Sequence, residues 1–511
     1  MSLGDNNAAA SSSTHASPLG EVWSIAWPTV LTMTSYTVMQ FVDALMVGQV
    51  SPLAVAAQGN GGIWAFTPIA IAMGFLTVVN TFVSQNLGAG RPEVGAKYAW
   101  NAVWGSIVVW LVVFLPIAAV LPWFMPLTHD RATIVDFDAL VQMETGYAQI
   151  LLVGGVFTLL ARGLHHYFFG LHRPKVVTVA AILGNLVNIG VNYVLIFGAF
   201  GLPALGVYGA AIGTVVGTIV EALIPGLVFF FPLHREFNTR HYWRPSWQPV
   251  RDLLRIGWPA AVQYGNEIVC WAIFMTVLVG RFGEAHMTAG WATLRFMHLS
   301  FMPAVGFSVA ATSLVGKYIG AGEPDTAVSR TRLALRMAVA YMTVCAVIMF
   351  VFRAPLIGLF VGGKDVTPEE AAVIIEIGAK LMICAAIFQT VDAFGIIYTG
   401  ALRGAGDTVF PGVVTMIYSW LFIVAGGWML VAWRPDWESV GPWIGAAVYI
   451  IMFGVTMALR FESGRWRSIK LIDDAAHDAA RIAPISPGPP AETSGSSVRD
   501  IAEEVAESIA D

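Results

Sequence analysis

A carboxylate stands inside an otherwise apolar stretch of this sequence. Glu267 lies partway along Arg255–Gly280, which is long enough to cross a bilayer as a helix. A charged side chain near the middle of a membrane helix costs roughly 2.5–3.5 kcal/mol on insertion scales, so it persists where it faces a polar interior, a partner or a pathway. We therefore interpret Glu267 as part of a transport site.

Two further acids, Asp43 and Asp392, also stand in apolar stretches. A carboxylate in a low-dielectric cavity is poorly solvated when it is empty, and either Na⁺ or H⁺ relieves that cost. Coupling to transport needs such a group, because its loaded and empty states can favour different arrangements of the protein. If Glu267 and Asp392 lie close together, their like charges disfavour joint ionisation and strengthen the binding of one cation.

Amide side chains accompany two of these acids at helical spacing. Gln263 precedes Glu267, and Gln389 precedes Asp392, each by about one helical turn. We expect each glutamine to orient its acid by hydrogen bonds. The alternative is that Glu267 and Asp392 form a satisfied structural pair between helices, but the cost of an acid within a bilayer favours a functional role.

The composition sets the class of protein. Of 511 residues, 57% are hydrophobic and 12% are charged, whereas soluble domains average about 45–50% apolar and 25% charged residues. Apolar runs of about twenty residues recur, which predicts transmembrane helices rather than the weaker alternation of a β-barrel. The expected fold is an all-α polytopic membrane protein with twelve transmembrane helices. The predicted spans are 23–48, 54–86, 97–124, 143–169, 175–199, 206–232, 252–280, 286–316, 331–360, 371–400, 409–432 and 440–461.

Lysine and arginine residues indicate which ends of these helices face the cytoplasm. If the N-terminus is inside, the basic residues of the outer loops are Arg131, Arg281, Arg353, Lys364 and Arg434, and the inner loops hold many more. This is the positive-inside pattern. It predicts a multi-pass protein of the cell (inner) membrane with both termini in the cytoplasm.

An internal duplication divides the spans six and six. Ile25–Pro28 recurs as Ile256–Pro259, and Gly88–Pro92 recurs as Gly320–Pro324. Because each copy has an even number of spans, the copies share one orientation and should be related by a pseudo-two-fold axis along the membrane normal, with the substrate path between two lobes. The expected parts are a disordered cytoplasmic tail (1–20), an N-terminal six-helix lobe (21–233), a basic cytoplasmic linker (234–251), a C-terminal six-helix lobe (252–465) and a mobile cytoplasmic tail (466–511).

Several motifs together resemble the multidrug and toxic compound extrusion (MATE) family. They are Val42–Gly48 followed by Leu53 and Ala54, then Val83–Gly90, the spacing from Pro259 to Glu267, and Gln389–Asp392 leading to Gly400–Gly404. The resemblance covers residues 20–465, and the placement of the acids is similar to the NorM-like branch. It implies export of cationic or polycyclic compounds in exchange for Na⁺ or H⁺.

The resemblance also implies roles for particular residues. Glu267 and Asp392 match the second-lobe carboxylates that bind the coupling cation, so they are the expected Na⁺ site, and Asp43 matches the first-lobe aspartate. Asn188 and Asn192, four residues apart on one helix face, match the asparagines around that aspartate. An interhelical hydrogen-bond cluster is the structural alternative for this first-lobe group.

One position departs from the family pattern. Phe388 stands where several NorM-like members carry tyrosine, which removes an oxygen ligand near Asp392. Na⁺ is therefore favoured over H⁺ only narrowly as the coupling ion. The residues expected to support the cation and substrate sites are Asn188, Asn192, Gln263, Gln389, Phe388 and Gln40.

Three classes of function follow from these patterns. We favour a secondary active exporter of small organic, mainly cationic substrates that acts as a monomer in the bilayer. A flippase for lipids or lipid-linked oligosaccharides is the alternative, but such proteins usually line the cavity with several cations, and here only Arg162 and Arg295 come near. The third class is an enzyme or a channel. An enzyme is not expected, since no Walker A pattern, zinc spacing or nucleophile elbow occurs. A channel stays an alternative, although no repeated filter sequence is visible. No cofactor and no nucleic-acid partner are expected.

Overall fold

The computed structural model describes residues 17–129, 131, 136–360 and 367–472 of the chain. Over these residues the regular structure is helical, and twelve helical stretches are long and apolar enough to cross a membrane. This confirms the predicted fold class and number of spans. The stretches are Pro18–Gly48, Leu53–Gly88, Pro92–Thr128, Phe137–Gly170, Pro174–Phe197, Val207–Phe237, Trp247–Phe282, Glu284–Gly320, Pro324–Val351, Pro368–Gly404, Val409–Trp433 and Val440–Glu462. The predicted N-terminal tail up to residue 16, and the C-terminal tail from residue 473, lie outside the described residues.

The N-terminal half consists of eight α-helices in order along the chain. They are α1 (Pro18–Gly48), α2 (Pro52–Leu76), α3 (Val78–Gly88), α4 (Pro92–Val109), α5 (Leu115–Phe124), α6 (Phe137–Gly170), α7 (Pro174–Phe197) and α8 (Val207–Phe230). Proline occupies the first turn of several of them, where the missing N–H has no helical partner in any case. We call this half the N lobe.

The second half repeats the arrangement after a short connection, α9 (Pro232–Phe237). Its helices, the C lobe, are α10 (Trp247–Ile273), α11 (Glu284–Gly320), α12 (Pro324–Val351), α13 (Arg353–Gly358), α14 (Pro368–Gly404), α15 (Val409–Tyr418), α16 (Gly427–Trp433) and α17 (Val440–Glu462). The prediction of a single span at 331–360 was wrong at its end. The helix breaks at Phe352, because Pro355 lacks the N–H that would bond to Val351.

Each lobe has its own apolar core, and the first helix of each lobe reaches into the core of the other. Val22, Ile25 and Ala26 at the start of α1 pack in the core of the C lobe. Leu253 and Ile256 near the start of α10 pack in the core of the N lobe. The two lobes are therefore joined by a reciprocal exchange of helix ends.

Equivalent glycines of the two sequence repeats make matching close contacts between the lobes. A Cβ atom added at Gly74 would lie 2.9 Å from the carbonyl oxygen of Ala260, and one added at Gly306 would lie 2.7 Å from the Cα of Val30. These contacts pair α2 with α10 and α11 with α1. In each pair the second span of one lobe meets the first span of the other, so the two contacts are equivalent under the duplication. The pattern fits the predicted pseudo-two-fold relation.

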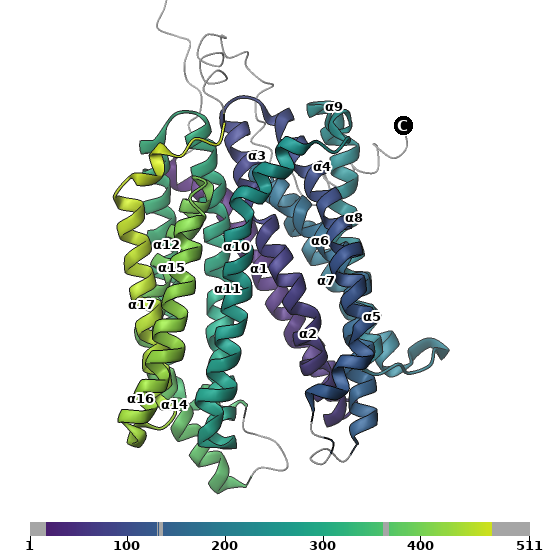
Figure 1. Cartoon of the computed structure of the whole chain (residues 1–511), viewed down its shortest axis with the longest axis vertical. Helices are drawn as coiled ribbons and strands as arrows, with labels where there is room; N and C mark the ends of the chain where they lie inside the picture. The colour runs from purple at the N-terminus through teal and green to yellow at the C-terminus, as the bar shows by residue number, and fades with distance from the viewer. Residues whose placement is uncertain (1–16, 130, 132–135, 361–366, 473–511) are drawn as a thin grey trace, which may run out of the picture.

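The lobes meet at the end of the molecule that holds the turns at 89–91, 171–173 and 321–323, which we call the basic end. Here Gln85 Nε2 donates to the Gly404 carbonyl oxygen at 2.9 Å, and Thr29 Oγ1 donates to that of Gly306 at 2.9 Å. In Figure 1 the ribbons of the two lobes lie close together at this upper end and diverge toward the lower end, the opposite end. These hydrogen bonds between the lobes support a closed basic end.

Ionic contacts reinforce the same junction. Glu21 on α1 accepts hydrogen bonds from Lys317 Nζ at 3.2 Å, Tyr318 Oη at 2.6 Å and Arg330 Nε at 2.7 Å, all from the C lobe. His172, in the turn before α7, lies 3.1 Å from the Ser313 carbonyl oxygen. Burial, with a smaller effect from the Lys317 charge, lowers the pKa of His172 to about 4. His172 is therefore neutral near pH 7, and its Nε2–H donates to Ser313.

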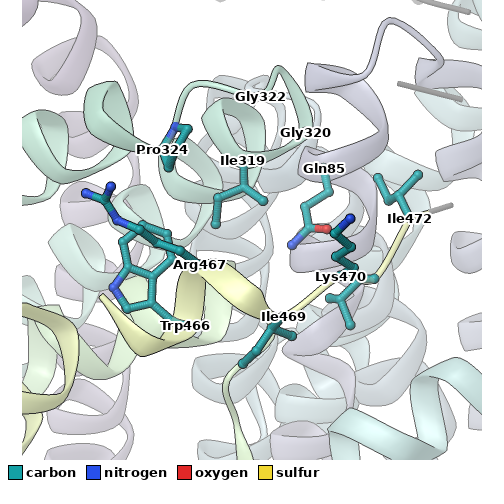
Figure 2. Close-up of a pocket in the computed structure, with 11 residues that line it drawn as sticks. Gln85, Ile319, Gly320, Gly322, Pro324, Trp466, Arg467, Ile469, Lys470 and Ile472 are labelled. Atoms are coloured by element: carbon teal, nitrogen blue, oxygen red, sulfur yellow. The ribbon is translucent and has the colours of Figure 1, made fainter. Parts of the chain in front are cut away.

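The segment after α17 crosses this junction. Trp466 is 1% exposed and stacks on Phe461 with 5.1 Å between ring centroids. Leu471 packs against the N-lobe core. Figure 2 shows Gln85 of α3 and Lys470 pointing toward each other across a small pocket. The predicted boundary of the C-terminal lobe at residue 465 therefore falls before residues that pack against the helices. Trp466 and Leu471 are apolar, but they stand in a segment that is polar overall, so the sequence did not separate them from the tail.

Deletion of this tail should have an effect that depends on where it begins. Removal of Ala475–Asp511 is expected to leave transport unchanged, because Trp466 and Leu471 remain. Deletion from Gly464 onward should lower the thermal stability of the purified protein, since it uncovers Phe461. Equal melting temperatures for the two truncated proteins would contradict this expectation.

Candidate functional site

The first candidate group lies in the N lobe on α1 and α7. Asp43 is 7% exposed and accepts a hydrogen bond from Asn192 Nδ2 at 2.6 Å. Asn192 Nδ2 also lies 3.3 Å from Asn188 Oδ1, as their spacing on one helix face predicts. A Cβ at Gly213 on α8 would overlap Asn192 Oδ1, so the glycine leaves room for this amide.

One oxygen of this group lacks a protein partner. Asn192 Oδ1 is buried, and no hydrogen-bond partner is recorded for it among the residues that the structure describes. A buried acceptor without a donor is unfavourable, and a cation beside the Asp43 carboxylate would relieve it. Tyr147 on α6, which sequence reasoning did not single out, lies within electrostatic reach of Asp43 and interacts with Gln58.

The second candidate group lies in the C lobe and brings together Glu267 of α10 and Asp392 of α14. The two carboxylates are close enough to repel each other electrostatically. The Gln263 side chain interacts with Glu267, as expected from the sequence. Tyr449 on α17 is 5% exposed and within electrostatic reach of both acids. Its position on a different span from either acid explains why spacing alone did not predict it.

Gln389 makes its hydrogen bonds to neighbouring helices of the C lobe. Its Nε2 donates to Ser300 Oγ on α11 and lies 3.3 Å from Met342 Sδ on α12. In the part of the chain that is described, no hydrogen bond joins it to Asp392. Residues three apart lie only about 60° apart around a helix, so Gln389 and Asp392 share one side of α14, but the Ser300 hydroxyl of α11 takes the Gln389 amide.

The remaining supporting candidates differ in exposure. Phe388 is fully buried in the C-lobe core. Gln40 is exposed on α1, three residues before Asp43. Neither residue brings a second polar group to the acids in the recorded hydrogen bonds of the described chain.

Two more acids lie within the spans and were not predicted. Glu144 on α6 is fully buried, accepts from Asn60 Nδ2 at 2.7 Å and lies 2.8 Å from His129 Nε2. Glu221 on α8 is 5% exposed and accepts from the Tyr36 hydroxyl. The rule that singled out Glu267, an acid inside an apolar run, applies equally to both and would have found them.

The chemistry of the C-lobe group suits a hard cation. Its oxygen ligands are the carboxylates of Glu267 and Asp392, with the Tyr449 hydroxyl and the Thr415 side chain that interacts with it nearby. Oxygen ligands are those that hard cations prefer. Within the described residues no cluster of three or more His, Cys, Asp or Glu side chains is placed to hold a metal ion.

A comparison with protein families decides the relationship. The family model described as MatE matches residues 28–194 and 260–429, which together are more than half of the chain. The chain belongs to the MatE family. Each matched segment of this MatE protein contains a different candidate group. The first contains Asp43, and the second contains the Glu267–Asp392 pair.

Known proteins extend the comparison. The MatE chain is 29% identical over 446 residues to the multidrug resistance protein NorM of Burkholderia vietnamiensis, covering 86% of this chain and 92% of that protein. It is 28% identical over 458 residues to the multidrug resistance protein MdtK of Edwardsiella ictaluri, covering 86% and 94%. A solved structure of a MOP superfamily transporter from Pyrococcus furiosus has the same fold, with a TM-score of 0.79, 18% identity and coverage of 88% and 97%. This MatE protein is thus a multi-pass inner-membrane transporter.

Proposed function

We propose that this protein is a secondary active exporter that exchanges small organic cations for a coupling cation bound by Glu267 and Asp392. The observation that carries the proposal is the pairing of two intramembrane acids in one lobe, within electrostatic reach of each other. Like charges at such a site favour uptake of one cation. The names of the NorM and MdtK relatives, both multidrug resistance proteins, support the substrate class.

The arrangement of the lobes supports alternating access. The junction at the basic end is closed by inter-lobe hydrogen bonds such as those of Gln85 and Thr29. We assign this end to the cytoplasm, with both termini there, because it gathers the lysine and arginine residues of the loops. The described conformation then faces outward, and export proceeds as the lobes rock about the junction of a single polypeptide.

We propose Na⁺ as the coupling ion, with H⁺ as the alternative. Phe388 withholds the hydroxyl that several family members present, but Tyr449 brings a phenolic oxygen to the same acids from α17. This restores an oxygen donor that a Na⁺ ion would use and a proton would not need. The position of Tyr449 therefore favours Na⁺ over H⁺ as the coupling ion.

The flippase alternative is weaker. A cavity for anionic headgroups would present several unbalanced cations, but Arg162 lies over the Tyr36 ring at 4.2 Å and within electrostatic reach of Glu221. Its charge is thereby balanced within the N lobe. Arg295 is held over the Phe360 ring at 5.9 Å.

Transport in proteoliposomes tests the proposal. Efflux of an organic cation such as ethidium should follow an imposed Na⁺ gradient when the pH is equal on both sides. Efflux that follows a pH gradient without Na⁺, and that does not change when Na⁺ is added, would make the Glu267–Asp392 pair a proton site. No gradient-dependent movement of organic cations under either condition would contradict the exporter function.

Replacement of Asp43 by asparagine should weaken export while the protein remains in the membrane. The change preserves the shape and the hydrogen bond to Asn192 but removes the titratable charge. The measurement is ethidium efflux normalised to the amount of protein in the vesicles. Full efflux at normal abundance would give Asp43 a structural role instead.

A further inference from the structure

A second polar cluster lies in the N lobe between Asp43 and the basic end. It consists of Tyr36 on α1, Arg162 and His165 on α6, and Glu221 on α8. Exposure is 9% for Tyr36, 1% for His165 and 5% for Glu221. Neither candidate cation site includes these residues, yet an acid and a histidine buried together within a membrane are costly unless they have a function.

The Glu221 carboxylate has a hydrogen-bond donor in Tyr36 but lies beyond hydrogen-bond distance of His165. The Tyr36 hydroxyl donates to its carboxylate, and the Arg162 guanidinium lies 4.2 Å from the centroid of the Tyr36 ring. His165 Nδ1 lies 3.7 Å from Glu221 Oε1, beyond hydrogen-bond distance. Both ring nitrogens of His165 are buried, and in the described chain Glu221 is the residue that they meet. His165 thus faces the Glu221 carboxylate at a distance longer than a full hydrogen bond.

We propose that His165 and Glu221 form a proton-binding site that is separate from the coupling acids. A bound proton completes the missing contact, because a protonated imidazole donates to the carboxylate and removes the penalty of a buried unpaired group. Arg162 opposes a lone imidazolium, so the proton is shared with the negative charge of Glu221. The inference rests on the proposed exporter function for its role in the cycle.

The groups that face this pair come from several helices. They are Tyr36 on α1, Arg162 and His166 on α6, Tyr264 on α10, which reaches Arg162, and Arg403 on α14, which reaches His166. On α7 the contact is Gly184, where an added Cβ would lie 3.2 Å from Glu221 Cβ. Glu221 is the acid of this cluster, so a proton held between His165 and Glu221 offsets the negative charge of Glu221.

The position of Tyr36 links this site to the lobes. Tyr36 belongs to α1, whose beginning packs in the C-lobe core and whose Thr29 bonds to Gly306. His165 and Glu221 belong to α6 and α8 of the N lobe. Opening of the basic end therefore displaces Tyr36 from Glu221, and a proton on His165 replaces the lost donor. By linkage, an acidic cytoplasm then favours the state with an open basic end.

The test is the distance between the lobes as a function of pH, without substrate. Spin labels at Phe200→Cys and Leu359→Cys, which are 90% and 75% exposed at the opposite end of the two lobes, report the arrangement after the native cysteines are replaced by alanine. In nanodiscs between pH 5.5 and 8.0, the ratio of the two distance populations should change by up to about tenfold per pH unit, as for one bound proton. His172 does not contribute in this range, because its pKa is about 4.

Variants identify the group that binds the proton. Glu221→Gln and His165→Asn should each remove the pH dependence, and Glu221→Gln should hold the protein in the state seen at low pH. Glu144→Gln is the matched control, since it changes another buried acid of the N lobe beside a histidine, and it should keep the dependence. A wild-type distance that does not change with pH, or a shift that persists in Glu221→Gln, would overturn the proposal. Because no substrate is present, a failure of the exporter function would appear only in the transport assay.

Discussion

Glu267→Gln and Asp392→Asn should each abolish cation-driven efflux while the protein remains folded in the membrane. Each substitution keeps the size of the side chain but removes one of two charges that repel each other within the C lobe. A single remaining carboxylate has less need of a cation, and the difference in free energy between loaded and empty states, which drives coupling, is lost. The measurement is Na⁺-driven ethidium efflux in proteoliposomes.

The double variant separates a functional pair from two structural residues. If both acids hold one cation, the double variant should be little worse than either single one, because groups that act as a unit are not additive. Glu376→Gln is the matched control: it lies on α14 with Asp392, is exposed, and pairs with Lys380 at 2.8 Å. It should transport normally. Additive losses that parallel reduced abundance would show that Glu267 and Asp392 serve stability instead.

Features that depend on length and hydropathy could be predicted from the sequence. The twelve spans follow from apolar runs, since a helix must be about twenty residues long to cross a bilayer. The duplication predicted a pseudo-two-fold relation between the halves, and the matching contacts of Gly74 and Gly306 fit it. The acids at 43, 267 and 392 were visible because a charge in an apolar run is rare.

Contacts that depend on which neighbouring helix a given helix face meets could not be predicted. Gln389 was expected to orient Asp392, but it bonds to Ser300 on α11. Helical spacing tells which residues share a face and leaves open which neighbouring helix that face meets. The partner of Glu221 is likewise set by the packing of α1 against α8, which brings in Tyr36 from a distant part of the chain. Trp466 was assigned to a tail because its anchor, Phe461, lies in the preceding helix.

Gly88→Leu and Gly320→Leu should each block transport by holding the basic end open. The two glycines occupy equivalent positions in the duplication. At the junction, Gly88 of α3 packs against α11, and Gly320 of α11 packs against α3. A Cβ at Gly88 would overlap the Lys317 carbonyl oxygen, and one at Gly320 would overlap that of Gln85. Both obstacles are backbone atoms, which cannot rotate away as a side chain can. Closure of this end therefore requires a residue without a side chain at both positions.

The size of the effect follows from the cost of overpacking. Forcing extra atoms into a packed contact costs about 1–3 kcal/mol, which shifts the populations of two states by roughly 5- to 150-fold. The outward-facing state should therefore become rare, and efflux should fall by a similar factor. The spin labels at positions 200 and 359 should report a shorter distance, since the opposite end closes as the basic end opens.

Gly105→Leu provides the matched control for these two substitutions. Gly105 lies on α4, and an added Cβ there meets no atom within 4 Å. Gly105→Leu removes a glycine from a membrane helix but creates no overlap with backbone atoms of the other lobe. It should therefore leave efflux and the distance between the spin labels unchanged. Normal transport by Gly88→Leu and Gly320→Leu would mean that the lobes do not close through this backbone contact. Equal loss in all three variants would trace the effect to helix stability, because the junction is untouched in Gly105→Leu.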